Sequence, residues 1–375
     1  MSLKVCVSAN SLQYPRHGGQ MWVYLNWCLG LKELSCEVTW LDGLAPNSIR
    51  PPAEQLSTLQ NRLEPYGLAN RIAVWTNGEP LPAEVSGKCL GMDTVTDADL
   101  LIDLNYETPA AVVQRFRRSA LIDIDPGLLQ TWVSAGQMSL VPHTCYFTTG
   151  ETVGQPGAKF PDLSLPWYYV SPPVCLEWWP PVRTTPPAPF TTISHWISKD
   201  WLKDGDRLYS NEKRTGFLPF LDLPRHTSQN LELALWLRKE EDAQERRMLE
   251  ERGWQVRDSV SVSSTPWDYQ RYIQSSLGEF SCVKPSCLRF ENAWISDRTL
   301  CYLASGKPAV MQDTGPSRIL PNTGGLFRFR DLQQAADHLE AVVADYDAQC
   351  RAARQLVEEF FDAKKVLKSV LETAL

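Results

Sequence analysis

The chain has 375 residues, of which 43% are apolar and 22% charged, and its formal net charge is −7 at pH 7. This composition excludes wholesale disorder, and because one hydrophobic core stops growing at roughly 250–300 residues we expect two domains. The negative charge argues against a dedicated nucleic-acid binder, whose signature is a basic face. With no signal peptide and no run of about 18 apolar residues, the sequence predicts a cytoplasmic protein without a membrane span.

Apolar runs alternate with helical patterns through the first half of the chain. Strands are predicted at 3–10, 37–42, 98–105, 120–125 and 144–151, and helices at 18–34 and 109–118. Such alternation is typical of βαβ units and of a parallel sheet covered on both faces. We therefore expect a first Rossmann-like domain over residues 1–170.

Prolines crowd the segment 161–189, which predicts a stiff connector without regular structure. We place the linker itself at 171–188. The alternating pattern then restarts, with strands expected at 189–196, after Gly253, at 279–284, 307–313 and 324–331, and helices at 230–242, 245–252, 267–276 and 296–306. This pattern predicts a second Rossmann-like domain at 189–357. The end of the chain is predicted to be helical, with a break near Phe361, and its last segment, 358–375, is expected to pack back on the first domain.

The cysteines and the tryptophans bear on the choice between structural and functional roles. The ten cysteines show no Cys-x-x-Cys pair and are predicted to be small core residues. The 14 tryptophans have two interpretations: their flat faces bind sugars or bases, or they fill the cores. His143 and His195 are interpreted as structural histidines.

The stretch 294–310 predicts a capped helix that turns into a strand. Ser296 is a suitable N-cap, and Gly306 ends the helix. Free amides at a helix start attract phosphate or carboxylate, and Arg298 can add a cationic fork. The alternative is that Asp297 complements the helix dipole and Arg298 is a solvated surface charge.

A second helix start follows the first predicted strand. Its loop holds His17 and ends in Gly18 and Gly19, and glycines permit a backbone to approach a diphosphate or a substrate closely. A plain turn from strand to helix is the alternative. Because ligands bind at the carboxyl ends of parallel strands, both helix starts are expected beside a cleft between the two domains.

The segment 14–42 resembles the first βαβ unit of GT-B glycosyltransferases, and 296–310 resembles the helix-to-strand segment of their donor-binding half. The similarity is to a bacterial group of the glycosyltransferase family 4/1 type and extends to 123–127, 148–151, 212–217 and 278–286. In many retaining members two glutamates stand eight residues apart. Here Ala293 and Cys301 occupy those positions and Glu291 lies two residues before the first, so inverting and retaining chemistry both stay open.

The resemblance implies two Rossmann-like domains facing a cleft. The C-terminal domain would hold a nucleotide-diphosphate sugar as donor substrate and the N-terminal domain an acceptor, with no metal or other cofactor. The implied reaction moves a hexose or pentose to a hydroxyl of a small molecule or glycan, and a modified nucleic-acid base fits the net charge less well. Alternatives are a nucleotide-sugar 2-epimerase of the same fold and a non-catalytic binding or scaffold protein.

Roles in donor binding follow from the resemblance and from the chemistry of the residues. Diphosphate contacts are assigned to Gly18, Gly19, Ser296, Asp297, Arg298 and a basic residue of the turn 212–214, either Lys213 or Arg214; a solvated turn is the alternative. Contacts to the nucleotide or the sugar are assigned to Trp267, Lys284, Glu291 and Trp294, with ordinary packing as the alternative for the two tryptophans.

His17 is the candidate base for the acceptor hydroxyl, because a histidine near neutrality accepts a proton; an unremarkable loop histidine is the alternative. Asp103, Asp125 and Glu151 are expected at strand ends, where they orient His17 or replace it. Asp123 and Asp125 also form an Asp-x-Asp pair that suits a metal or hydrogen bonds to adjacent loops, and we assign no metal.

Overall fold

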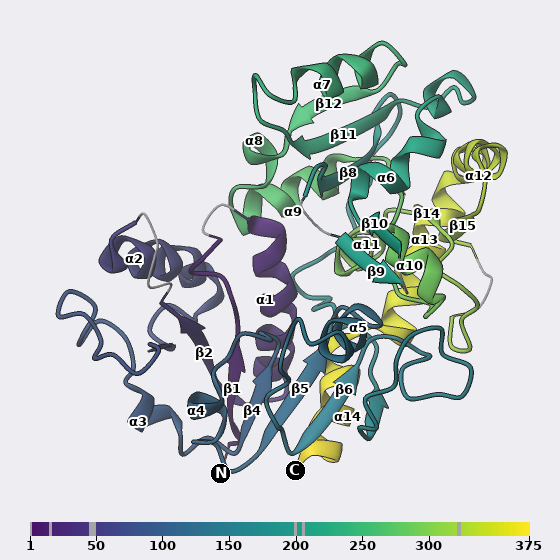
Figure 1. The fold of residues 1–375 in the computed structure, drawn as a ribbon. Coiled ribbons are helices and arrows are strands. Elements are labelled where there is room, and N and C mark those ends of the chain that lie inside the picture. The colour runs from purple at the N-terminus through teal and green to yellow at the C-terminus, as the bar shows by residue number, and fades with distance from the viewer. Residues whose placement is uncertain (1, 15–16, 45–49, 199–200, 205–206, 321–323) are drawn as a thin grey trace. The chain divides into compact units, whose positions relative to one another are not determined.

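The computed structural model describes residues 2–14, 17–44, 50–198, 201–204, 207–320 and 324–375. Pro15 and Arg16, in the loop before the glycine pair, lie outside them. The chain divides into two compact units (Figure 1). Unit 1 is formed by 1–154, 161–175 and 362–375, and unit 2 by 155–160 and 176–361.

Unit 1 is built on a parallel sheet. In spatial order its strands are β3 (Ile72–Trp75), β2 (Glu37–Gly43), β1 (Lys4–Ser8), β4 (Leu100–Asp103), β5 (Ser119–Asp123), β6 (Cys145–Thr148) and β7 (Trp167–Tyr169). The chain first adds β2 and β3 on one side of β1, and the strand order then reverses so that β4 to β7 follow on the other side. The connecting helices are α1 (Gly18–Glu33), α2 (Pro52–Leu63), α3 (Met92–Val95), α4 (Ala110–Val113) and α5 (Leu128–Ser134).

Unit 2 repeats this order around a second parallel sheet, with the reversal between β8 and β13. The strands follow as β12 (Gln255–Asp258), β11 (Leu231–Trp236), β8 (Phe190–His195), β13 (Gly278–Ser281), β14 (Ala309–Gln312) and β15 (Leu326–Phe329). Its helices are α6 (Lys213–Phe217), α7 (Ala243–Glu250), α8 (Ser259–Ser263), α9 (Pro266–Ser275), α10 (Pro285–Phe290), α11 (Asp297–Ala304), α12 (Leu332–Ala344) and α13 (Tyr346–Phe360). Two Rossmann-like units are thus confirmed.

A short antiparallel hairpin follows β8 and consists of β9 (Trp201–Asp204) and β10 (Arg207–Ser210). None of the described helices combines the length and the apolar character needed to cross a lipid bilayer.

The helix predicted at 230–242 is wrong, because Leu231–Trp236 forms strand β11. Leu, Glu and Ala favour helices as isolated residues. In the sheet, however, β11 pairs with both β8 and β12, and its Glu232 accepts hydrogen bonds from Tyr272 at 2.6 Å and Arg257 at 2.9 Å. These contacts with distant segments, which a local pattern does not contain, decide the conformation.

The proline-rich segment contains one strand where none was predicted. Trp167–Tyr169 forms β7 at the edge of the first sheet, and an edge strand tolerates a neighbouring Pro166 because its outer side needs no hydrogen-bond partner. The remainder of the segment up to Pro189 has no helix or strand.

Aromatic residues account for much of both cores. Trp22, Trp27, Trp40, Trp179 and Trp196 are fully buried, which confirms packing as the role of these tryptophans. In unit 2 the Phe280 and Phe329 rings stack with centroids 5.3 Å apart.

The last helix, α14 (Ala363–Ala374), belongs to unit 1 and packs on α1 (Figure 1). The expected break near Phe361 is confirmed, since α13 ends at Phe360 and the chain re-enters unit 1 at residue 362. Gly30 of α1 allows the close approach. A Cβ atom placed there would lie 2.6 Å from the Ala363 Cβ and 2.6 Å from a methyl group of Leu367.

Replacing Gly30 with valine is therefore expected to separate α14 from α1. Overpacking of this kind destabilises by roughly 1–3 kcal/mol, which lowers the melting temperature of a unit of this size by about 2–4 °C for each kcal/mol. Gly91→Ala is the matched control, because nothing lies within 4 Å of a Cβ added there. Calorimetric melting of both variants checks the prediction, and equal melting temperatures contradict it.

Candidate functional site

The start of α11 is held by a side-chain cap. Ser296 accepts a hydrogen bond from the Arg298 amide at 3.3 Å, which confirms the predicted N-cap. Helix α11 ends at Ala304, and Gly306 terminates the last turn with a φ of +68° and a hydrogen bond from its amide to the Leu303 carbonyl at 2.9 Å. Asp297 lies in the first turn, where its charge complements the helix dipole as the alternative interpretation expects.

Arg298 is not the solvated surface charge of the alternative interpretation. Its Nε atom lies 2.7 Å from Oε1 of Glu279, and Nη1 donates to the Ile193 carbonyl at 3.1 Å. The Glu279 side chain is fully buried, and that of Arg298 is 12% exposed. Because two of its donors are engaged inside the protein, Arg298 ties the first turn of α11 to β8 and β13. Its role in binding the diphosphate stays a prediction.

Lys213 lies where the strand order of unit 2 reverses. Its Nζ atom donates to the Cys282 carbonyl at 2.9 Å, directly after β13. Burial, together with the nearby charges of Arg298 and Lys284, lowers the pKa of the Lys213 ammonium to about 7. Three cationic side chains therefore lie near the carboxyl end of β13, of which Arg298 is paired with Glu279. An anion placed beside Lys213 and Lys284 would relieve the repulsion that contributes to the lowered pKa of Lys213.

The neighbouring Arg214 has a different environment. Its Nε atom pairs with Glu245 at 2.8 Å, and Trp196 donates to the same carboxylate at 2.9 Å. This pairing raises the pKa of Arg214 further. Of the two basic residues predicted as alternatives, Lys213 is the one near the other cations, and Arg214 links α6 to α7.

The loop before α11 has an unusual backbone. Glu291 and Ala293 adopt positive φ values of +45° and +58°, and non-glycine residues with such values cluster at functional sites. The Ala293 amide donates to the Thr314 carbonyl at 3.1 Å, and the Thr314 hydroxyl donates to the Trp294 carbonyl at 2.8 Å. The Glu291 carboxylate pairs with Lys159 at 2.7 Å. The loop 291–294 is thus held by the segment after β14.

Exposed aromatic rings lie near the carboxyl ends of several strands of unit 2. Trp267, in the first turn of α9, is 37% exposed, whereas Trp294 is half-buried. The sequence interpretation missed Trp236, which is 38% exposed at the end of β11 and faces the His195 ring with centroids 5.6 Å apart. His195, predicted to be structural, is exposed, and its role stays a prediction. A strand prediction for 230–242 would have placed Trp236 at the end of a strand, beside the predicted strand 189–196 that ends near His195.

In unit 1 the reversal between β1 and β4 brings the loop of His17 to the carboxyl edge of the sheet. His17 precedes α1, and its ring stacks on Tyr14 with centroids 5.5 Å apart and an interplanar angle of 20°. Burial lowers the pKa of His17, against a hydrogen bond with Gln20 that acts in the opposite direction. The imidazole is therefore neutral at pH 7 and able to accept a proton. Gly18 and Gly19 are the first residues of α1.

Both carboxylate oxygens of Asp103 are engaged by neighbouring groups of unit 1. One of its oxygens accepts from the Thr108 hydroxyl at 2.9 Å and the Asn105 amide at 3.1 Å, and the other lies 3.1 Å from Nε2 of His143. The His143 side chain is 1% exposed, which confirms its predicted structural role.

The two residues of the Asp-x-Asp pair lie in different elements, because β5 ends at Asp123 and Asp125 follows in the loop. Asp123 is buried and accepts hydrogen bonds from Gln130 and Thr148 at 2.9 Å each, and burial raises its pKa to about 6. Asp125 follows in the loop, where its carbonyl accepts from the Leu128 amide at 3.0 Å. The Asp123 carboxylate is thus bonded to adjacent elements, as one of the two interpretations predicts.

Glu151 is buried in the loop after β6. Glu107, which sequence reasoning missed, is exposed on the loop after β4. Its carboxylate lies 3.4 Å from the amide nitrogens of both Asn10 and Gln13, in the loop that also carries His17. The sequence feature that could have identified Glu107 is its position just after the predicted strand 98–105.

The buried ion pair between Arg298 and Glu279 leads to a prediction about stability. Arg298→Ala is expected to lower the free energy of unfolding of unit 2 by about 3–5 kcal/mol, because it leaves the Glu279 carboxylate buried and unpaired. Arg225→Ala, which removes an exposed pair with Asp222, should change it by at most about 1 kcal/mol. Urea unfolding followed by tryptophan fluorescence compares the two, and equal losses would show that the Arg298 pair is not structural.

No protein-family model matches the chain, and no curated protein is similar to it in sequence. Solved structures are similar over the whole chain. An α-glucosyltransferase (AGT) in complex with UDP matches with a TM-score of 0.62 and 12% identity over 100% of both chains. HepE from Anabaena with UDP and glucose gives 0.58 and 12% over 99% of each.

Sucrose-phosphate synthase from Thermosynechococcus elongatus matches with a TM-score of 0.55 and 11% identity, over 99% of this chain and 98% of the other. At such identities the likeness concerns architecture alone. Two parallel sheets with the same strand order, and full-length similarity to these enzymes, show that the chain has the GT-B fold of glycosyltransferases.

Proposed function

We propose that the chain is a glycosyltransferase that moves a hexose from a UDP-sugar to an acceptor hydroxyl. The observation that carries the proposal is the gathering of Lys213, Lys284 and Arg298 where β13 ends, beside the first turn of α11. Structures of similar fold hold UDP, which supports UDP as the nucleotide.

In this proposal the diphosphate lies against Lys213 and the amides at the start of α11. Departure of UDP leaves negative charge on the diphosphate, and preformed dipoles and cations stabilise such charge most strongly when they are shielded from water. Lys213 takes up a proton as the anion arrives, so its full charge is present when the bond to the sugar breaks. The cations and amides take the role that a metal has in other transferases.

The strained loop 291–294 would border the sugar, and Trp267 or Trp236 would stack on the base, because flat aromatic faces suit both kinds of group. Unit 1 would hold the acceptor. His17 would remove the proton from the acceptor hydroxyl as that oxygen attacks the anomeric carbon. A small molecule or glycan fits the net charge of −7 better than a nucleic acid does.

Titration of UDP and UDP-glucose, with GDP-, dTDP- and CDP-sugars as competitors, tests the donor assignment. Because bound diphosphate favours protonated Lys213, whose pKa is about 7 in the free protein, affinity should be constant below pH 7. Above pH 7 it should fall by up to about tenfold per pH unit as each binding event takes up one proton. Calorimetry in two buffers of different ionisation enthalpy measures this uptake.

Lys213→Met should weaken UDP binding and abolish the pH slope, whereas Arg214→Met, which removes the adjacent cation, should leave the slope in place. A slope that persists in Lys213→Met would remove Lys213 from the donor site. No binding of any nucleotide by the wild type would refute the proposed function itself.

His17→Ala is expected to lower turnover by about 10²–10⁴-fold with UDP binding unchanged, since a general base acts on the acceptor in the transition state. The wild-type rate should decline as the pH falls through the lowered pKa of His17, below its ordinary value of 6.5. The measurement is UDP release with an acceptor that supports turnover. Loss of UDP affinity in His17→Ala, or donor turnover without any acceptor, would contradict this division of roles.

A further inference from the structure

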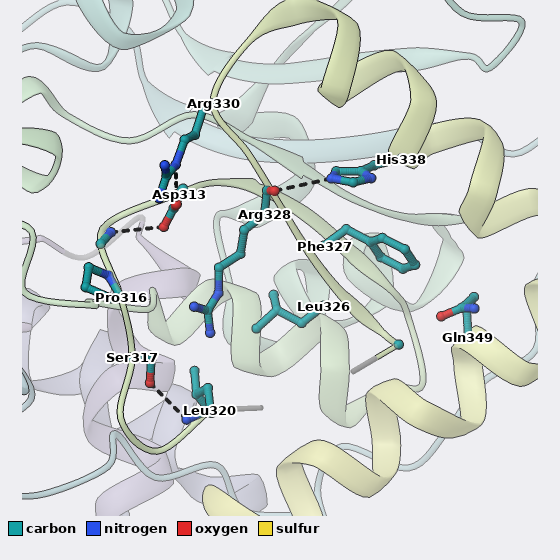
Figure 2. Close-up of a pocket in the computed structure, with 12 residues that line it drawn as sticks. Asp313, Pro316, Ser317, Leu320, Leu326, Phe327, Arg328, Arg330, His338 and Gln349 are labelled. Carbon is teal, nitrogen blue, oxygen red and sulfur yellow. Dashed lines mark hydrogen bonds and ion pairs between the residues drawn. The ribbon is translucent and has the colours of Figure 1, made fainter. Parts of the chain in front are cut away.

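Unit 2 contains a pocket of about 750 Å³ whose described lining residues do not include Lys213, Lys284 or Arg298. It lies along strand β15 at the edge of the sheet, and its walls come from residues within 313–320, from Gly324 and β15, and from α12 and α13 (Figure 2). The volume falls within the range of small-molecule sites, which is roughly 300–1,000 Å³.

The pocket is lined by both apolar and polar side chains. Leu320 and Leu326 supply apolar surface, and Ser317, Arg328 and Arg330 supply polar groups. Figure 2 shows the Arg328 side chain directed toward Pro316 and Leu326, on the side of β15 away from His338. Such a lining suits a ligand with one charged end and a larger uncharged body.

The charges of the lining favour an anion. The described lining holds two guanidinium groups, of Arg328 and Arg330, and one carboxylate, that of Asp313, which pairs with Nε of Arg330 at 2.7 Å. Nε2 of His338 lies 3.2 Å from the Arg328 carbonyl, which it can approach only as a donor. Arginine forks match the planar or tetrahedral oxygens of carboxylates and phosphates.

The pocket wall also supports the loop before α11. Asp313 accepts a hydrogen bond from the Gly315 amide at 3.0 Å, and Gly315 has a φ of +111°. A Cβ atom at Gly315 would lie 2.8 Å from the backbone of Glu291, so the two backbones are in direct contact. A ligand that shares Arg330 with Asp313 therefore acts on a segment packed against the loop 291–294.

We propose that this pocket is a second ligand site, which binds a small oxyanion, a phosphate ester or a carboxylate on a sugar-sized body, and whose occupancy changes the affinity of unit 2 for the sugar donor. The change in donor affinity rests on the proposed function; binding of the oxyanion does not. Linkage requires the effect to be reciprocal, so that UDP changes the affinity for the oxyanion by the same factor.

Three matched probes test the chemistry: glucose 6-phosphate, glucuronate and glucose. Calorimetric titration of the full chain should show one site for a charged probe and no binding of glucose, and the stronger of the two charged probes identifies phosphate or carboxylate. Arg328→Gln should weaken that binding by about tenfold or more, the effect of losing a charge-assisted fork. Arg328→Lys should give an intermediate loss, and Arg225→Gln, which alters an exposed arginine outside the pocket, should change nothing.

Near-UV circular dichroism of each variant verifies the fold without reference to activity. Lys213→Met separates the sites, because it should weaken UDP and leave the oxyanion probe bound. Equal binding by wild type and Arg328→Gln, no binding of either charged probe, or loss of the probe in Lys213→Met would overturn the second site. If the probe binds through Arg328 but UDP affinity is the same with and without it, the link to the donor is overturned; if UDP fails to bind at all, the proposed function fails and the oxyanion site stands.

Discussion

Arg298 and Glu279 meet inside unit 2, and the first turn of α11 cannot move without separating them. The pair joins that turn to β13, and the bond to the Ile193 carbonyl joins it to β8, across the reversal of strand order. A buried ion pair contributes little net stability but fixes geometry, because each partner is strongly disfavoured alone. The Arg298 contacts therefore fix the position of the start of α11 relative to the end of β13, where the candidate donor site lies.

The same arrangement explains how an acidic chain can offer a positively charged site. The net charge of −7 is a property of the whole surface, whereas Lys213 is partly buried, close to Arg298 and Lys284. Burial weakens the screening of these charges by water. A site of this kind attracts a diphosphate over short distances without giving the protein the basic face of a nucleic-acid binder.

Sequence reasoning succeeded where the physical cause is local. The Ser296 cap, the Gly306 terminator and the alternation of strands and helices depend on residues close together in the chain, and each was predicted. It failed where the cause is distant. Leu231–Trp236 carries helix-forming residues yet is a strand because the sheet supplies partners on both sides. The partner of Arg298 lies 19 residues away and on another element, so no motif showed that the guanidinium is engaged.

Helix α14 lies at the end of the sequence but completes the first unit. A ribosome synthesises residues 176–361, the bulk of unit 2, before it reaches those that cover α1 around Gly30. During translation the face of α1 that α14 covers in the folded protein therefore stays exposed while unit 2 is synthesised. The growing chain would be most exposed to chaperones and proteases in that interval.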